Sequence, residues 1–170
     1  MENLQTGSVT TPVGPIRPTF LTVLCILTFI GSTWGIISNV RQYLTANTAS
    51  ALVSKAIEDS KTEIQKSGDE GSKTAESIMN SVNDALNPAN LKKLAIYGGI
   101  ASLLTLLGAF LMFQLKKNGF YIYVLGTLVG IVGTFMVFGG NIIGMITGSA
   151  MSFFGILFVI LYGLNLKHLK

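Results

Sequence analysis

Long apolar stretches alternate with polar segments along most of this chain. Four stretches, at residues 20–40, 94–115, 120–138 and 142–164, contain no Asp, Glu, Lys or Arg. A helix rises ~1.5 Å per residue, so about 20 residues cross the ~30 Å hydrocarbon core of a bilayer. Each stretch has about that length. The pattern predicts an all-α, polytopic membrane protein with four transmembrane helices.

The polar segment between the first two stretches carries two apolar stripes of helical period. The first stripe consists of Val53, Ala56, Ile57, Ser60 and Ile64. The second consists of Ala75, Ile78, Met79, Val82 and Leu86. Between them lies a Gly-containing break, after which Ser72 is the expected N-cap, and Asn87 with Pro88 is the expected stop signal. The stripes predict an amphipathic helical hairpin inserted between the first two spans.

Two alternatives to this hairpin stay open. The segment is poor in Val, Ile and Leu, so a flexible solvated connector is one of them. The other is a single long helix, because no Gly or Pro occurs from Ile36 to Ser67 and only Asn47 and Thr48 are weak candidates for a break. In that case the first span runs directly into the first helix of the insertion.

The expected domain organisation follows from these patterns. We interpret the first span as a retained anchor, because no pattern typical of a signal-peptide cleavage site follows it. The segments are a disordered tail (1–18), a first span (19–40), the insertion (41–93), a second span (94–115), a third span (120–138), a fourth span (142–164) and a short C-terminal tail (165–170).

Glycines recur every fourth residue in the third and fourth spans. They are Gly126, Gly130, Gly140, Gly144 and Gly148. Small residues at this spacing let helix backbones approach closely in lipid, where the hydrophobic effect does not draw helices together. We expect the third and fourth spans to pack on each other through these glycines, with an oligomer or partner interface as the alternative. The tight turn predicted at Asn118-Gly119 makes the second and third spans antiparallel neighbours.

Charge adds an orientation to this picture. The net charge is +4, but the insertion holds seven basic and seven acidic residues and is neutral, which argues against nucleic acid as a partner. The other basic residues are Arg17, Lys116, Lys117, Lys167 and Lys170. With four spans these all flank the membrane on one side, so the positive-inside rule predicts cytoplasmic termini and an extracytoplasmic insertion. The same residues are candidates for contact with anionic lipid headgroups.

Candidate chemistry is sparse. The chain has one histidine, His168 in the tail, and one cysteine, Cys25 inside the first span. No ionisable Asp, Glu, Lys or Arg lies within a span, and the Ser and Thr residues there can hydrogen-bond their own helix. We therefore predict no catalytic residue, no cofactor and no metal site, and expect that the protein is not an enzyme.

The leading hypothesis is a non-catalytic accessory or scaffolding subunit that binds another membrane protein or complex. Its partner-binding candidates are Ile78, Met79, Val82 and Leu86. One alternative is a small-solute channel or carrier that acts as a homo-oligomer with a Ser- and Thr-lined pore. Another is an envelope-sensing protein whose insertion detects a ligand.

Two segments carry a family resemblance. The run from Arg17 to Ser32, RPTFLTVLCILTFIGS, and the run from Asn118 to Tyr123, NGFYIY, resemble small uncharacterised four-helix membrane proteins of Bacteroidota. The resemblance implies a multi-pass protein of the bacterial cytoplasmic (inner) membrane. It implies no activity.

Overall fold

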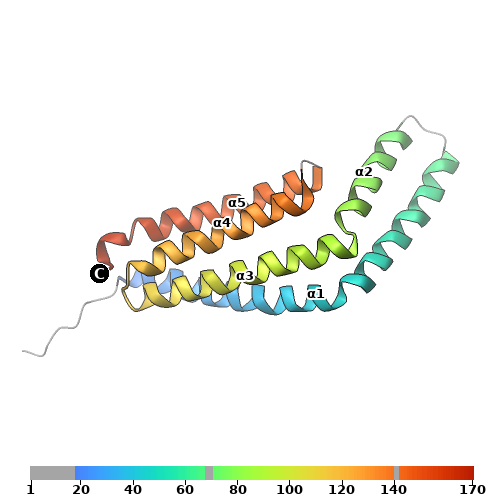
Figure 1. The fold of residues 1–170 in the computed structure, drawn as a ribbon. Helices are drawn as coiled ribbons and strands as arrows, with labels where there is room; N and C mark the ends of the chain where they lie inside the picture. Colours follow the sequence, from blue (N-terminus) through green and yellow to red (C-terminus); the bar gives the residue numbers. More distant parts are fainter. Residues whose placement is uncertain (1–17, 68–70, 140–141) are drawn as a thin grey trace, which may run out of the picture.

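The structure, a computed structural model, describes residues 18–67, 71–139 and 142–170. Its elements are α1 (Thr19–Ser67), α2 (Ser72–Ala85), α3 (Pro88–Phe113), α4 (Asn118–Phe138), α5 (Ile142–Gly163) and the short 3₁₀ helix η1 (Leu166–His168). Figure 1 shows these helices and the path of the chain between them. Within the described residues there is no β-strand, as predicted for an all-α protein.

Four of the helices, α1, α3, α4 and α5, are long and apolar enough to cross a membrane. Large apolar side chains such as Ile30, Leu107 and Met136 are exposed on them. A bilayer accepts such a surface, because lipid tails are as apolar as these side chains. The prediction of a multi-pass membrane protein with four spanning helices is confirmed at this level.

The first span and the first half of the insertion form one continuous helix, α1, of 49 residues. At ~1.5 Å per residue it is about 74 Å long, more than twice the ~30 Å of hydrocarbon. Its C-terminal part therefore extends beyond the bundle as a curved rod (Figure 1). The helix does not end near residue 40, because no Gly or Pro interrupts it. Asn47 and Thr48 do not break it either.

The second helix of the insertion, α2, folds back along α1 to complete the hairpin (Figure 1). The Ser54 hydroxyl donates to Asn83 Oδ1 at 2.8 Å, and the Lys61 ammonium donates to Asn80 Oδ1. Where the hairpin joins the bundle, Ala46, Ser50 and Ala85 are buried. The hairpin is thus held by polar side chains along its length and by small residues at its base.

The start of α2 differs from the prediction, whereas its end agrees with it. Ser72 is the first residue of α2 instead of its N-cap, which is Gly71, and no side chain caps the helix there. At the other end α2 stops at Ala85 before Asn87 and Pro88, as expected. Asn87 then begins the next helix, because its Oδ1 accepts from the Asn90 backbone N–H at 2.8 Å and Pro88 occupies the first turn.

Helix α3 lies at the centre of the bundle, with α1 on one side and α4 on the other, while α5 packs on α4 (Figure 1). Helices α3 and α4 are antiparallel neighbours, joined by a short turn. In that turn Leu115 has a positive φ of 62°. Asn118 and Gly119 open α4, so the predicted tight connection is present.

The third and fourth spans pack on each other as predicted, as α4 and α5, but the glycines of α4 face α3 instead of α5. A Cβ on Gly126 would lie 2.8 Å from Leu104 Cβ, and one on Gly130 would lie 3.3 Å from Ala101 Cβ. Gly148 does pack on α4, against the ring of Phe135. Gly144 is buried, and Gly140 lies outside the described residues. Small residues on α3 explain the difference, since they offer α4 a complementary face beside the short turn.

At the end of the bundle where α1 begins and α5 ends, all four spanning helices meet in one buried cluster. Its members are Leu21, Leu24, Cys25, Met112, Leu115, Tyr123, Tyr162 and Leu169. The Thr28 and Tyr162 hydroxyls are hydrogen-bonded at 2.7 Å, which links α1 to α5. The rings of Tyr123 and Tyr162 pack with centroids 4.8 Å apart. This cluster closes one end of the bundle.

Candidate functional site

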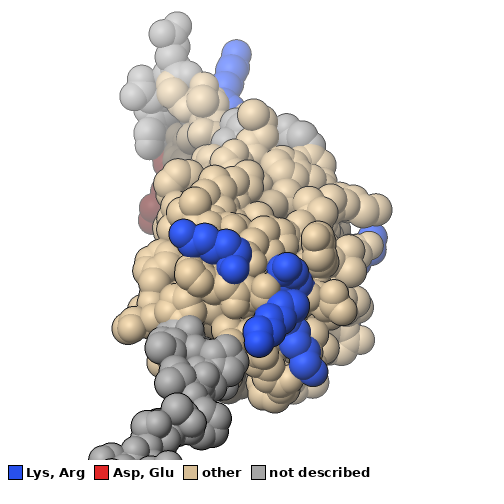
Figure 2. Space-filling model, turned by 90° about the vertical axis from the view of Figure 1, so that its left-hand side faces the viewer, with Lys and Arg blue, Asp and Glu red and all other residues tan. Residues whose placement is uncertain are grey.

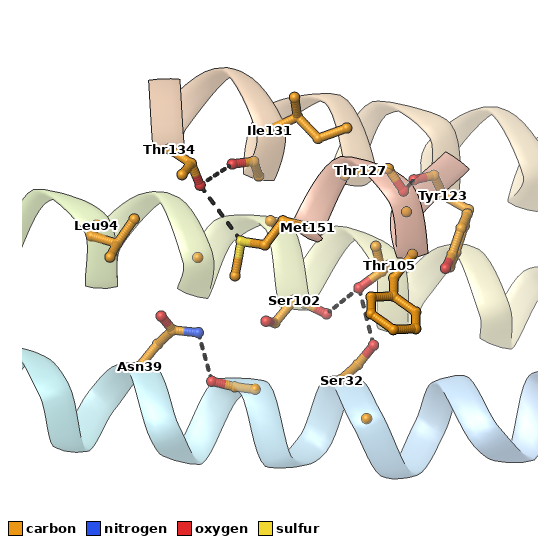
Figure 3. A pocket seen from close by; sticks show the side chains of 18 of the residues that line it. Ser32, Asn39, Leu94, Ser102, Thr105, Tyr123, Thr127, Ile131, Thr134 and Met151 are labelled. Atoms are coloured by element: carbon orange, nitrogen blue, oxygen red, sulfur yellow. Dashed lines mark hydrogen bonds between the residues drawn. The ribbon is translucent and has the colours of Figure 1, made fainter. Parts of the chain in front are cut away.

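A cavity of about 450 Å³ lies between α1, α3, α4 and α5. Figure 3 shows side chains from all four helices around it. On the α1 side it is lined by Gly31, Ser32, Gly35, Asn39 and Gln42, and on the α5 side by Met151, Phe154 and Gly155. We name this space the α1–α5 cleft. A smaller cavity of about 190 Å³ shares Ser32 and Tyr123 with it and reaches Thr28 near the closed end of the bundle.

The cleft opens sideways between α1 and α5. Gly31 is exposed, and a methyl group on it would have no neighbouring atom within 4 Å. Across the gap, Met151 and Phe154 are 53% and 61% exposed although they line the cavity. Because α1 and α5 are both membrane-spanning candidates, this opening faces the bilayer. Whatever enters it from the side comes from within the membrane.

Four of the hydroxyl groups that line the cleft, those of Ser32, Thr105, Thr127 and Thr134, are already hydrogen-bonded. Ser32 Oγ and Thr105 Oγ1 are 3.0 Å apart, which joins α1 to α3. Thr127 donates to the Tyr123 carbonyl at 3.1 Å, and Thr134 donates to the Gly130 carbonyl at 2.9 Å (Figure 3). These bonds offset the cost of placing hydroxyls in hydrocarbon. The lining therefore accepts an apolar surface without leaving these groups unpaired.

Two amide side chains line the cleft from the part of α1 nearer the hairpin. Asn39 Nδ2 donates to the Gly35 carbonyl at 2.6 Å, within its own helix. Gln42 Nε2 donates to the Leu91 carbonyl at 3.5 Å, on α3. The Asn39 amide also lies against Gly98, where no side chain stands in its way. These contacts hold α1 on α3 and leave the α5 side of the cleft free.

The predicted site residues are divided between two places. Gly126 and Gly130 line the cleft, whereas Gly144 and Gly148 are not among its lining residues. The partner-binding candidates belong to the hairpin, where Ile78 is 46% exposed and Met79, Val82 and Leu86 are half-buried. The structure does not bring these two sets together in one site.

The sequence prediction missed the part of the site on α1. Gly31 and Gly35 are four residues apart, the same spacing that drew attention to the third and fourth spans. The hydroxyl of Ser32 lies beside them. This signal was present in the sequence, but it does not show which neighbouring helix the glycines face.

Reactive side chains do not gather in the cleft. Cys25 is buried in the cluster at the closed end, and His168 is exposed on η1. Among the described residues, no group of three or more His, Cys, Asp or Glu side chains is placed to hold a metal ion. The chemistry available at the cleft is that of shape, apolar contact and hydroxyl hydrogen bonding.

The chain was compared with protein-family models, curated proteins and solved structures, and nothing in the three comparisons matches it. The resemblance to small bacterial membrane proteins therefore stays a prediction.

Proposed function

We propose that this protein is a non-catalytic accessory or scaffolding subunit that binds a transmembrane helix of another membrane protein in the α1–α5 cleft. The observation that carries the proposal is the sideways opening between α1 and α5, where Gly31 has open space beside it. If the protein bound no partner here, direct contact between α1 and α5 across this gap would gain dispersion energy.

The lining of the cleft suits a helix as its occupant. In lipid, helices associate through close packing across small residues and through side-chain hydrogen bonds. Among the glycines that line the cleft, Gly35 is covered by Ser102 of α3 and Gly155 by Thr127 of α4, whereas Gly31 has open space beside it. A partner helix with its own small residues can therefore approach the α1 backbone closely at Gly31. The hairpin adds a second contact surface beyond the end of the bundle, with Ile78 exposed on it.

The experiment is co-purification with a blocked cleft. Gly31→Leu places a branched side chain at the opening, where the free protein has room for it. Overpacking against a bound helix costs about 1–3 kcal/mol, so we expect co-purification of the partner in mild detergent to fall about fivefold or more. Thermal unfolding in detergent is expected to stay unchanged.

Ile30→Phe is the matched control. It adds bulk at the residue that precedes Gly31 on α1. The Ile30 side chain is 66% exposed and does not line the cleft. We expect Ile30→Phe to retain the partner. Equal retention by both variants would contradict the proposal, and so would solute flux through proteoliposomes that Gly31→Leu abolishes, since flux favours a channel or carrier.

We also propose that the protein lies in a bacterial cytoplasmic membrane with its termini inside and the hairpin outside. Support comes from the separation of charge between the ends of the bundle. Lys116, Lys117 and Lys167 lie at the terminal end, whereas the acidic residues after Glu2 all fall between residues 58 and 84. Flanking positive charge marks the cytoplasmic side of a span.

A further inference from the structure

The C-terminal tail is fixed against the turn between α3 and α4. After α5, the Asn165 side chain donates to the Leu161 carbonyl at 2.8 Å, and Leu169 is buried in the terminal cluster. The Lys170 backbone N–H donates to the Leu115 carbonyl at 2.7 Å. The Lys117 backbone N–H in turn donates to the Lys170 carbonyl at 2.8 Å. These bonds bring the lysines of the tail and of the turn together on one end of the molecule.

Lysines gather on this end face, and none of the described Asp and Glu residues lies there. Figure 2 views the molecule from this end and shows their side chains spread over it. The exposed lysines of the tail and the turn are Lys116, Lys117, Lys167 and Lys170. The described acidic residues all lie in the C-terminal part of α1 and in α2, which form the hairpin at the opposite end (Figure 1). No described Asp or Glu side chain therefore neutralises the positive charge of the end face.

The position of the lysines identifies their partner. They follow the ends of α3 and α5 and precede α4, so they lie where membrane-spanning helices leave the hydrocarbon. Lipid phosphate groups occupy that level of a bilayer. A lysine ammonium binds phosphate as a point charge, and attraction to an anionic surface contributes about fivefold in binding for each residue, ~1 kcal/mol.

We propose that this basic end face, formed by Lys116, Lys117, Lys167 and Lys170, is a binding site for the headgroup of an anionic phospholipid. The tail is the structural part of the site, because its hydrogen bonds to Leu115 and Lys117 place Lys167 and Lys170 beside the turn. The lipid is favoured over soluble phosphate, since its acyl chains stay in the bilayer beside the spans and only the headgroup has to be bound.

The test is native mass spectrometry of the full chain in detergent with a mixture of phosphatidylglycerol and phosphatidylcholine. Wild type is expected to retain phosphatidylglycerol preferentially. The double variant K116Q/K117Q should lose about 25-fold in that preference, from about fivefold for each lysine. A second variant, K167Q on η1, should lose about fivefold by the same reasoning. Both change exposed side chains and keep the backbone hydrogen bonds of the tail.

K92Q/K93Q is the matched control, because Lys92 and Lys93 form a second lysine pair at the other end of α3. It should keep the lipid preference of wild type. Equal loss in the control and in K116Q/K117Q would overturn the proposal, as would unchanged preference in both K116Q/K117Q and K167Q. Displacement of the lipid by millimolar inorganic phosphate would also overturn it. An acidic protein held by this face with no lipid preference would do so as well.

Discussion

Single glycines determine how closely α3 and α4 approach. At the turn, a Cβ on Gly119 would lie 2.5 Å from the Gly108 carbonyl oxygen and 2.6 Å from the Met112 backbone nitrogen. One on Gly108 would lie 2.6 Å from the Tyr123 backbone nitrogen. Backbone atoms cannot move aside as a flexible side chain can. These two glycines therefore allow a contact that no other residue would permit.

Gly119→Ala should destabilise the bundle, whereas Gly31→Ala should not. The added methyl at 119 forces α3 and α4 apart, and overpacking of this kind costs about 1–3 kcal/mol. At position 31 the methyl enters open space, and Ala is favoured over Gly in a helix by up to about 1 kcal/mol. Thermal unfolding of both variants in the same detergent checks this. A Gly119→Ala protein as stable as wild type would show that the backbones are not in this contact.

Residue spacing predicted part of this packing and not the rest. The spacing of Gly126 and Gly130 identified a packing face correctly, and both lie in helix contacts or line the cleft. The prediction that these two glycines face the fourth span was wrong, because every span of this chain has small residues that could serve as the partner face. Spacing shows which face of a helix is small, but not which neighbour comes to it.

At the scale of elements, α1 connects the membrane part to the hairpin. It is one helix from Thr19 to Ser67, so the same element lines the cleft and forms half of the hairpin. The sequence allowed either this rod or a break near Asn47. The absence of Gly and Pro is compatible with the rod, because short polar residues such as Asn and Thr are tolerated in a helix at a small cost. Contacts with α2 and α3 along the rod add to its stability.

The side of the membrane on which the hairpin lies can be measured with single cysteines. Asn83→Cys is on α2, Lys116→Cys is at the opposite end of the bundle, and both positions are exposed. The native Cys25 is buried and adds little background. In intact spheroplasts an impermeant thiol reagent should label Asn83→Cys, and Lys116→Cys should be labelled only after lysis. The reverse pattern would place the termini outside.

The whole molecule is a row of helices whose outer members, α1 and α5, are hydrogen-bonded to each other at one end, and α2 of the hairpin also contacts α5. In the order α1, α3, α4 and α5, each helix packs on the next, and the row is joined back on itself where Thr28 meets Tyr162. Beyond that contact α1 and α5 are separated by the cleft. Charge-free stretches predicted the four spans and the short turn predicted the pairing of α3 and α4. The gap between α1 and α5 depends on contacts between distant segments, so no local pattern could predict it.

The most direct test of the cleft as a binding site is photo-crosslinking in native membranes. Phe154 and Phe153 are adjacent, exposed phenylalanines of α5, but only Phe154 lines the cleft. Each is replaced in turn by p-benzoylphenylalanine, and the crosslinked products are identified by mass spectrometry. We predict that position 154 crosslinks to a transmembrane segment of another protein in much higher yield than position 153. Equal yields, products with lipid alone, or a second copy of this chain as the only product would contradict the account.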